Sequence, residues 1–284
     1  MIELDASAVL LQWAAGGMLF VWVTTRHRVV GLGYGWTMRI VYLLMALGAL
    51  LIAWQFGWQP TRDIPTAGLA VLCSFGLIQS YRRRSVGVSG QRQLAEKRSS
   101  RVAAMTGIDR SDKLKSGDGP EFDPLIDLAT ALVGFVGVIA AGIEGGTPVW
   151  LSVVRMVIGA LFLGVVSDAM LLGHWYLVQP GLDRSLLVEL VRWTGILWLP
   201  ETIVFLLPTG MLSVLNGTID DGYGGLLGWF WVACVLTTIG LVVATIMALR
   251  EKTYSAVMAA TGLLYLAILM GFGIDLVARA ALSL

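Results

Sequence analysis

Six ionisable residues lie in or beside two neighbouring apolar stretches, and their types and spacing could support chemistry. Charged groups at membrane depth are costly, so they usually face the interior of a helix bundle and mark ion or proton pathways. The candidates for ligand binding or a proton path are Arg155, Asp168, His174, Glu189, Arg192 and Glu201.

The two stretches, residues 149–173 and 186–213, are expected to form an antiparallel helical hairpin. Residues at equal depth in such a hairpin have position numbers with a nearly constant sum. The predicted pairs are Arg155 with Glu201, Asp168 with Arg192, and His174 with Glu189. Two interpretations follow: the pairs neutralise one another and fix the register of two helices, or they line a polar site or proton path.

Local features around these residues favour the second interpretation. Pro200 and Pro208 predict a kink, which frees backbone carbonyls that neighbours or water must satisfy. His174, Trp175 and Tyr176 place a titratable ring beside two aromatic groups, where a quinone or a lipid headgroup could stack. The alternative is an ordinary interfacial aromatic belt.

Two further carboxylates are expected to be structural. Asp275 and Arg279 are four residues apart and can pair along one helix face. Asp127 lies near the start of an expected helix, where the positive end of the helix dipole stabilises it.

Composition predicts a membrane protein rather than a soluble one. Hydrophobic residues make up 57% of the 284 residues, only 14% are charged, and the mean hydropathy is +0.78. A soluble domain has about a quarter charged residues. The stretches are continuously apolar rather than alternating, which indicates helices and not a β-barrel.

The elements that must position the candidates are eight apolar stretches, each close to the length of about 20 residues that crosses a bilayer. The expected fold class is therefore an all-α integral membrane protein, an eight-transmembrane-helix bundle. The expected spans are residues 8–25, 38–56, 65–81, 124–143, 149–173, 186–213, 224–249 and 255–280.

The connections between these spans alternate in charge. Residues 1–81 hold the first three spans, residues 82–123 form a basic loop, and residues 124–284 hold the other five. Ten of the twenty Lys and Arg residues lie in the loop. The positive-inside rule then makes the loop cytoplasmic and both termini extracytoplasmic in a plasma (inner) membrane protein. The composition of the loop 82–123 predicts disorder or a short amphipathic helix around 90–105, which would face anionic lipid or a cytoplasmic partner.

A shift of 142 residues suggests an internal repeat of two four-helix halves in parallel orientation. The aligned residues are Gly17, Leu19, Phe20, Val23, Gly31 and Tyr34 with Gly159, Leu161, Phe162, Val165, Gly173 and Tyr176. The alternative is coincidence among residues that are common in membranes.

Few cofactors fit this chain. A bis-histidine haem site would need both histidines of the chain, His27 and His174. His27 lies in a typical basic flank, so haem is not expected. Cys73 and Cys234 lie in apolar stretches, and no zinc, copper or iron–sulfur pattern occurs. No metal site and no nucleic-acid partner are expected, whereas a bound quinone or lipid fits the aromatic run.

Three classes of function remain. The first is a non-catalytic, quinone-adjacent or respiratory-associated subunit of a larger membrane complex, with other membrane subunits as partners. In helix number and character alone, the layout is similar to quinone-interacting membrane subunits of the polysulfide-reductase type. The second is a small-solute or proton-coupled transporter. The third is a lipid-modifying membrane enzyme with Asp168, His174 and Glu201 as acid–base groups.

Overall fold

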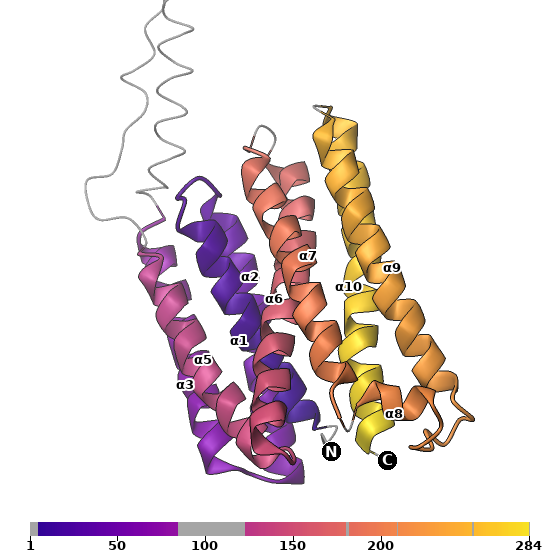
Figure 1. Cartoon of the computed structure of the whole chain (residues 1–284). Coiled ribbons are helices and arrows are strands. Elements are labelled where there is room, and N and C mark those ends of the chain that lie inside the picture. Colours follow the sequence, from indigo (N-terminus) through magenta and orange to yellow (C-terminus); the bar gives the residue numbers. More distant parts are fainter. Residues whose placement is uncertain (1–4, 85–122, 180–181, 209, 252, 284) are drawn as a thin grey trace, which may run out of the picture.

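The computed structural model describes residues 5–84, 123–179, 182–208, 210–251 and 253–283. These residues form helices joined by short connections and contain no strand (Figure 1). The helices are α1 (Ala6–Thr25), α2 (Leu32–Phe56), α3 (Pro60–Arg82), α5 (Leu125–Glu144), α6 (Val149–Val178), α7 (Ser185–Leu206), α8 (Met211–Leu215), α9 (Leu226–Arg250) and α10 (Tyr254–Ser283). The predicted helix around 90–105 falls outside the described residues.

Seven of these helices are long and apolar enough to cross a membrane. They are α1, α2, α3, α5, α6, α9 and α10. The eighth expected span corresponds to α7, which is 22 residues long but carries Glu189, Arg192 and Glu201. Every stretch of 18 residues within α7 contains all three of these charged residues, whereas the three of α3 (Arg62, Asp63 and Arg82) lie at its ends.

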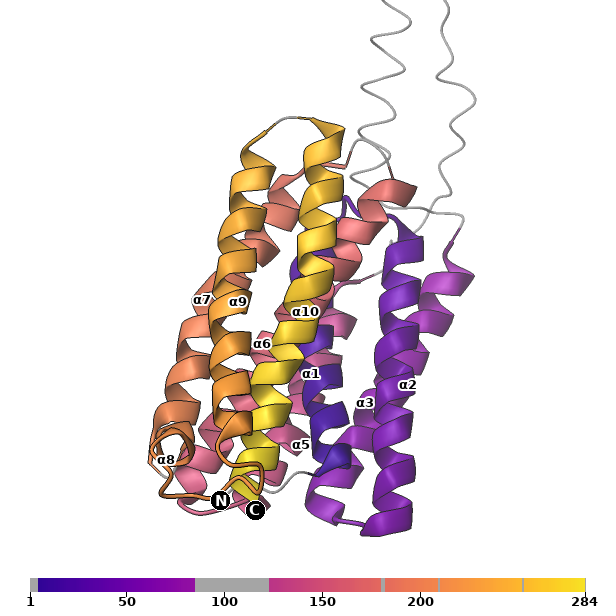
Figure 2. The ribbon, with the colours of Figure 1, turned by 90° about the vertical axis from the view of Figure 1, so that its right-hand side faces the viewer.

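The long helices run alternately up and down the bundle (Figures 1 and 2). Helices α1, α2, α3 and α5 pack around one another, and α6, α7, α9 and α10 form a second group of four. Helices α1 and α5 of the first group contact α6 of the second. Helix α6 therefore lies between the two groups and touches both.

The contact between α1 and α6 depends on glycine. A Cβ on Gly16 would lie 1.6 Å from the carbonyl oxygen of Ala160, and a Cβ on Gly164 would lie 2.2 Å from the Gly16 backbone. Only the absence of side chains lets the two backbones come this close, a device common between membrane helices. The two four-helix groups are thus joined by direct backbone contact.

Several helix boundaries differ from the expected spans. Helix α2 begins at Leu32 rather than at 38, and α3 begins at Pro60 rather than at 65. The expected span 186–213 is divided, because α7 ends at Leu206 and the short α8 follows. Leu207 is extended, which fits its place before Pro208, since proline disfavours a helical conformation in the preceding residue.

The two ends of the bundle differ in charge. We call the end where α1 begins and α10 ends the terminal end (Figures 1 and 2). The opposite end, the basic end, carries Arg26, Arg82, Arg184 and Arg250 at helix ends or in connections. The described connections therefore keep the alternation of charge that the sequence indicates.

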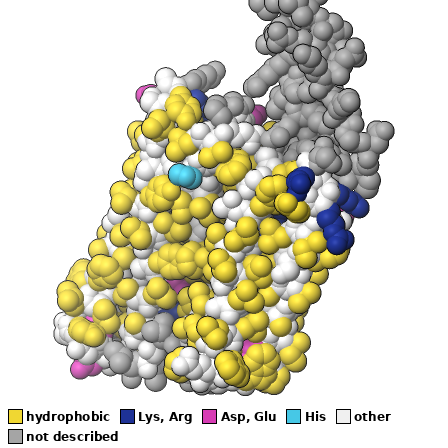
Figure 3. Space-filling view, turned by 180° about the vertical axis from the view of Figure 1, so that it is seen from behind, with side chains coloured by type: hydrophobic (Ala, Val, Ile, Leu, Met, Phe, Trp, Pro, Cys, Tyr) yellow, Lys and Arg dark blue, Asp and Glu magenta, His cyan; other side chains and the backbone are white. Residues whose placement is uncertain are grey.

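Apolar side chains cover most of the outer surface between the two ends, as Figure 3 shows for one face. Large exposed hydrophobic residues occur on every long helix except α1, for example Leu44 on α2, Val71 on α3 and Leu236 on α9. A surface of this kind would be unfavourable in water and matches the hydrocarbon of a bilayer. The chain is therefore a multi-pass membrane protein in contact with lipid.

Candidate functional site

A buried polar cluster joins helices α1, α6 and α10 towards the terminal end. Arg279 donates to Asp275 Oδ2 at 2.9 Å and to Gln12 Oε1 at 2.6 Å, and it also contacts the sulfur of Met156 at 3.3 Å. The Gln12 amide lies 3.5 Å from Asp275 Oδ1. All four side chains are buried. The sequence correctly predicts the local Asp275–Arg279 pair, but not its partners on the other helices.

Gly159 on α6 makes room for this cluster. A Cβ at this position would lie 2.0 Å from the Gln12 amide nitrogen and 3.2 Å from Asp275 Oδ1. Helix α6 therefore presents bare backbone to the polar side chains of α1 and α10.

Glu201 on α7 lies beside the same cluster and is fully buried. Neither of its carboxyl oxygens has a hydrogen-bond partner among the described residues. Asp275 and Arg279 are the charged groups whose fields act on it. Most buried polar side-chain atoms in proteins have a partner, so this carboxyl group needs an explanation.

Arg155 on α6 binds the end of α7 rather than Glu201. Its guanidinium donates to the backbone carbonyls of Val204 at 2.8 Å and Leu207 at 3.0 Å. The Val204 carbonyl would normally accept the N–H four residues later, but that residue is Pro208, which has none. Arg155 thus satisfies a carbonyl that the proline leaves free, and the predicted Arg155–Glu201 ion pair is wrong.

Asp168 lies in a second buried site, closer to the basic end. Its Oδ1 is 3.4 Å from the hydroxyl of Tyr34 on α2, a long and weak hydrogen bond. The other carboxyl oxygen, Oδ2, and the hydroxyl of Tyr42 have no partner in the described part of the chain. Gly159 and Asp168 are nine residues apart on α6, so roughly 13 Å of helix separates the two sites.

Asp168 does not pair with Arg192, which is a second correction. The Asp168 side chain is fully buried and faces α2, whereas Arg192 is exposed on the outer side of α7. Equal depth in a hairpin fixes position along the helix axis but leaves the rotation about that axis open.

The predicted pair of His174 and Glu189 is also wrong. Glu189 binds Arg26 at 2.6 Å and His27 at 3.2 Å, both just after α1. His174 is exposed, and its Nδ1 lies 3.4 Å from the Tyr265 hydroxyl on α10. No carboxylate of the described residues hydrogen-bonds to His174, so its predicted role in ligand binding loses its basis.

The two aromatic neighbours of His174 have structural contacts. The Trp175 indole donates to Gln179 at 3.0 Å and packs edge-on against Tyr34. The Tyr176 hydroxyl donates to the backbone carbonyl of Asp183 and closes the turn between α6 and α7. Both aromatic side chains thus make contacts within the bundle, and a bound quinone stays a prediction.

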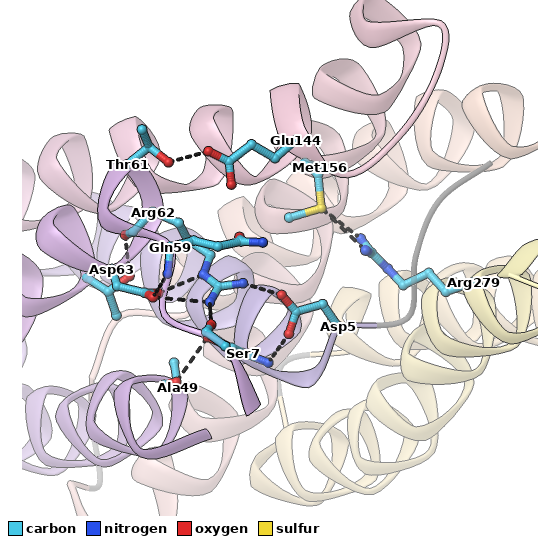
Figure 4. Close-up of polar contacts among 12 residues, drawn as sticks. Asp5, Ser7, Ala49, Gln59, Thr61, Arg62, Asp63, Glu144, Met156 and Arg279 are labelled. Carbon is cyan, nitrogen blue, oxygen red and sulfur yellow. Dashed lines mark hydrogen bonds and ion pairs between the residues drawn. The ribbon is translucent and has the colours of Figure 1, made fainter. Parts of the chain in front are cut away.

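Two buried ion-pair groups were missed at the sequence level. Arg39 donates to both oxygens of Asp127, at 2.8 and 2.7 Å, and both residues are buried. Arg62 binds Asp63 at 2.7 Å and also Asp5, in the first turn of α3 (Figure 4). The expected span 65–81 begins after Arg62, and Arg39 is only the second residue of the expected span 38–56. Helix starts placed one to two turns earlier would have revealed both.

No group of three or more His, Cys, Asp and Glu residues in the described ranges could hold a metal ion. What the interior does offer is carboxyl groups that can take up and release protons. Comparison with known protein families, with curated proteins and with solved structures finds no match.

Proposed function

We propose that this chain is a proton-coupled membrane transport protein in which Glu201 takes up and releases the coupling proton. The observation that carries the proposal is the fully buried Glu201 carboxyl group, which has no hydrogen-bond partner in the described part of the chain. Burial of an ionised carboxylate without donors is far more costly than burial of the neutral acid. Ionisable residues of this kind mark proton and ion pathways in membrane proteins.

The charges around Glu201 allow both of its protonation states. Arg155 and Arg279 are two positive groups whose fields act on each other, and Asp275 and Glu201 are two carboxyl groups. The four groups are neutral together when both carboxyl groups are ionised, and a proton on Glu201 gives them a single positive charge. Arg279 stays bonded to Asp275 in either state, so the charge that changes on proton exchange is that of Glu201.

Carbodiimide labelling tests this proposal directly. Dicyclohexylcarbodiimide is an apolar reagent that adds to protonated carboxyl groups, and peptide mass spectrometry locates the adduct. We expect an adduct on Glu201 that decreases as pH rises, in a site where Asp275 and Arg279 supply the charges that act on it. The exposed Glu144 is the matched control and should remain unlabelled by a reagent confined to the membrane.

Proton uptake by the purified chain tests transport. Proteoliposomes with an internal pH dye and a potassium diffusion potential should take up protons. Glu201→Gln should abolish this uptake, whereas Glu251→Gln, at an exposed carboxylate of the basic end, should leave it intact. Equal uptake by wild type and Glu201→Gln, together with an unlabelled Glu201, would refute the proposal. Labelling of the native protein needs no variant, so a folding defect in Glu201→Gln cannot hide the answer.

We also propose that α7 is an eighth membrane span, in a plasma-membrane protein whose basic end is cytoplasmic and whose termini are extracytoplasmic. Its 22 residues extend about 33 Å, enough for the hydrocarbon core. The excess of Lys and Arg after α3 supports the orientation. A cysteine introduced at Ser100 should react with an impermeant maleimide only after the cells are opened. Labelling in intact cells would show that the proposed orientation is wrong.

The other two classes of function remain predictions. A quinone-adjacent, respiratory-associated subunit with a parallel repeat of two four-helix halves predicts a stoichiometric membrane partner in mild detergent. A lipid-modifying enzyme predicts that Asp168, His174 and Glu201 act together. Asp168, His174 and Glu201 lie in three different surroundings, as described above, which supports proton transport better than joint catalysis.

A further inference from the structure

A small polar cavity lies beside the Arg279 cluster at the terminal end. Its volume is about 30 Å³. Its lining comes from α1, α3, α5, α6 and α10 and from the residues next to them, so both four-helix groups contribute. The polar lining residues are Asp5, Gln59, Arg62, Glu144, Ser152 and Arg279.

The outer and inner walls of the cavity differ in exposure. Glu144 is exposed, and Asp5 is partly exposed, with 35% of its side chain accessible to solvent. Arg62 and Arg279 are buried, and Figure 4 shows Arg279 reaching Met156 while Arg62 binds Asp5. The cavity thus connects solvent-facing carboxylates with the arginine that holds Asp275 and acts on Glu201.

Ser152 supplies a second, independent observation. Its side chain lines the cavity and is 3% exposed, yet its hydroxyl has no hydrogen-bond partner in the described part of the chain. A buried hydroxyl of this kind is normally satisfied by protein or by ordered water. A cavity of at least about 10–15 Å³ can hold a water molecule when polar partners surround it, so this cavity has space for one or two.

We infer that this cavity is a water-binding site that forms the proton entrance from the terminal end of the bundle. Water bound to Ser152 Oγ would lie between the acidic mouth at Asp5 and Glu144 and the inner Arg279. Protons reach the Glu201 region by this route without crossing the apolar part of the bundle. The role as a proton entrance rests on the proposed function of Glu201, whereas the presence of water in the cavity does not.

Hydroxyl-radical footprinting of the full chain tests the water directly. Radicals made from bound water by a short X-ray pulse oxidise the nearest methionine sulfur, and mass spectrometry locates the product. Met156 lines the cavity and is 3% exposed, whereas Met18 and Met38 are 0% exposed and do not line it. We expect Met156 to be oxidised several-fold faster than Met18 and Met38. Equal rates for the three residues would overturn the inference.

The variant Ser152→Val separates the entrance from the function of Glu201. Its two methyl groups replace the hydroxyl and occupy the cavity, so oxidation of Met156 and proton uptake should both fall several-fold. Thr245→Val is the control, since the Thr245 hydroxyl donates to the Leu241 carbonyl of its own helix and does not line the cavity. Unchanged Met156 oxidation and uptake in Ser152→Val would refute the entrance. Failure of carbodiimide labelling at Glu201 would instead refute the proposed function and leave the footprint of the cavity unaffected.

Discussion

Removal of one member of the Arg39–Asp127 pair should strongly destabilise the protein. The two side chains are 2% and 1% exposed and are joined by two hydrogen bonds of 2.8 and 2.7 Å, with a third from Thr25 to Asp127 at 3.1 Å. The pair links α2 to α5, with Thr25 on α1. Loss of one partner leaves an uncompensated buried charge, which costs about 3–5 kcal/mol.

A double-mutant cycle measures this effect. We would compare Arg39→Met, Asp127→Leu and the double variant by unfolding in mixed detergent micelles, with tryptophan fluorescence as the signal. Each single variant should lose about 3–5 kcal/mol in the free energy of unfolding. The double variant should lose much less than the sum of the two, because no unpaired charge remains.

The exposed pair Arg26–Glu189 provides the matched control. Its side chains are 39% and 28% exposed, and such pairs contribute at most about 1 kcal/mol. The reasoning fails if the two Arg39–Asp127 single variants are harmless, if their losses simply add, or if the Arg26–Glu189 cycle gives an equal coupling energy.

Two further predictions concern the helix seam and one helix start. Gly16→Val should prevent stable packing of α1 on α6. Gly240 on α9 has open space around it, so Gly240→Ala should leave the free energy of unfolding unchanged or raise it by up to about 1 kcal/mol. Similar unfolding midpoints for the two variants would contradict the close packing of α1 on α6. Asp221 precedes α9 and accepts backbone N–H bonds from Gly225, Tyr223 and Leu227, which lower the pKa of its carboxyl group. Because this pKa is lowered in the folded state, the stabilisation is complete above the ordinary value of about 4 and is lost as pH falls through the lowered value. Thermal unfolding of wild type and Asp221→Asn should therefore converge at low pH, and a constant difference between them would argue against this cap.

The sequence predicts the helices well because the signal for a span is local. Runs of apolar residues mark seven membrane-capable helices, and a spacing of four residues suffices for the Asp275–Arg279 pair. The ends of spans are harder, since a helix that begins with polar residues, as α3 does at Pro60, shows no apolar signal there. Arg62 falls outside the expected span 65–81 for this reason, and Arg39 lies at the edge of the expected span 38–56 although it is well inside α2.

The candidate site was predicted only in part. Glu201 and Asp168 are buried ionisable residues as expected, but their neighbours come from α10 and α2, which are far away in the sequence. Depth matching between two helices cannot reveal such neighbours, because it ignores rotation and the other helices. The polar residue Gln12 lies in an apolar stretch, and only the fold shows that it meets Arg279.

The position of the charged residues within α7 has a consequence for biosynthesis. A charged residue near the middle of an inserting segment costs about 3 kcal/mol at the translocon, and α7 carries three ionisable residues. Arg155, which binds the carbonyls at its end, is synthesised earlier, but Arg279, whose charge acts on Glu201, emerges only with α10. In the proposed topology, with α7 as a span, we expect α7 to settle in the bilayer only after the last helix is made. A nascent chain that stops before α10 would present a poorly inserted segment to membrane quality-control proteases.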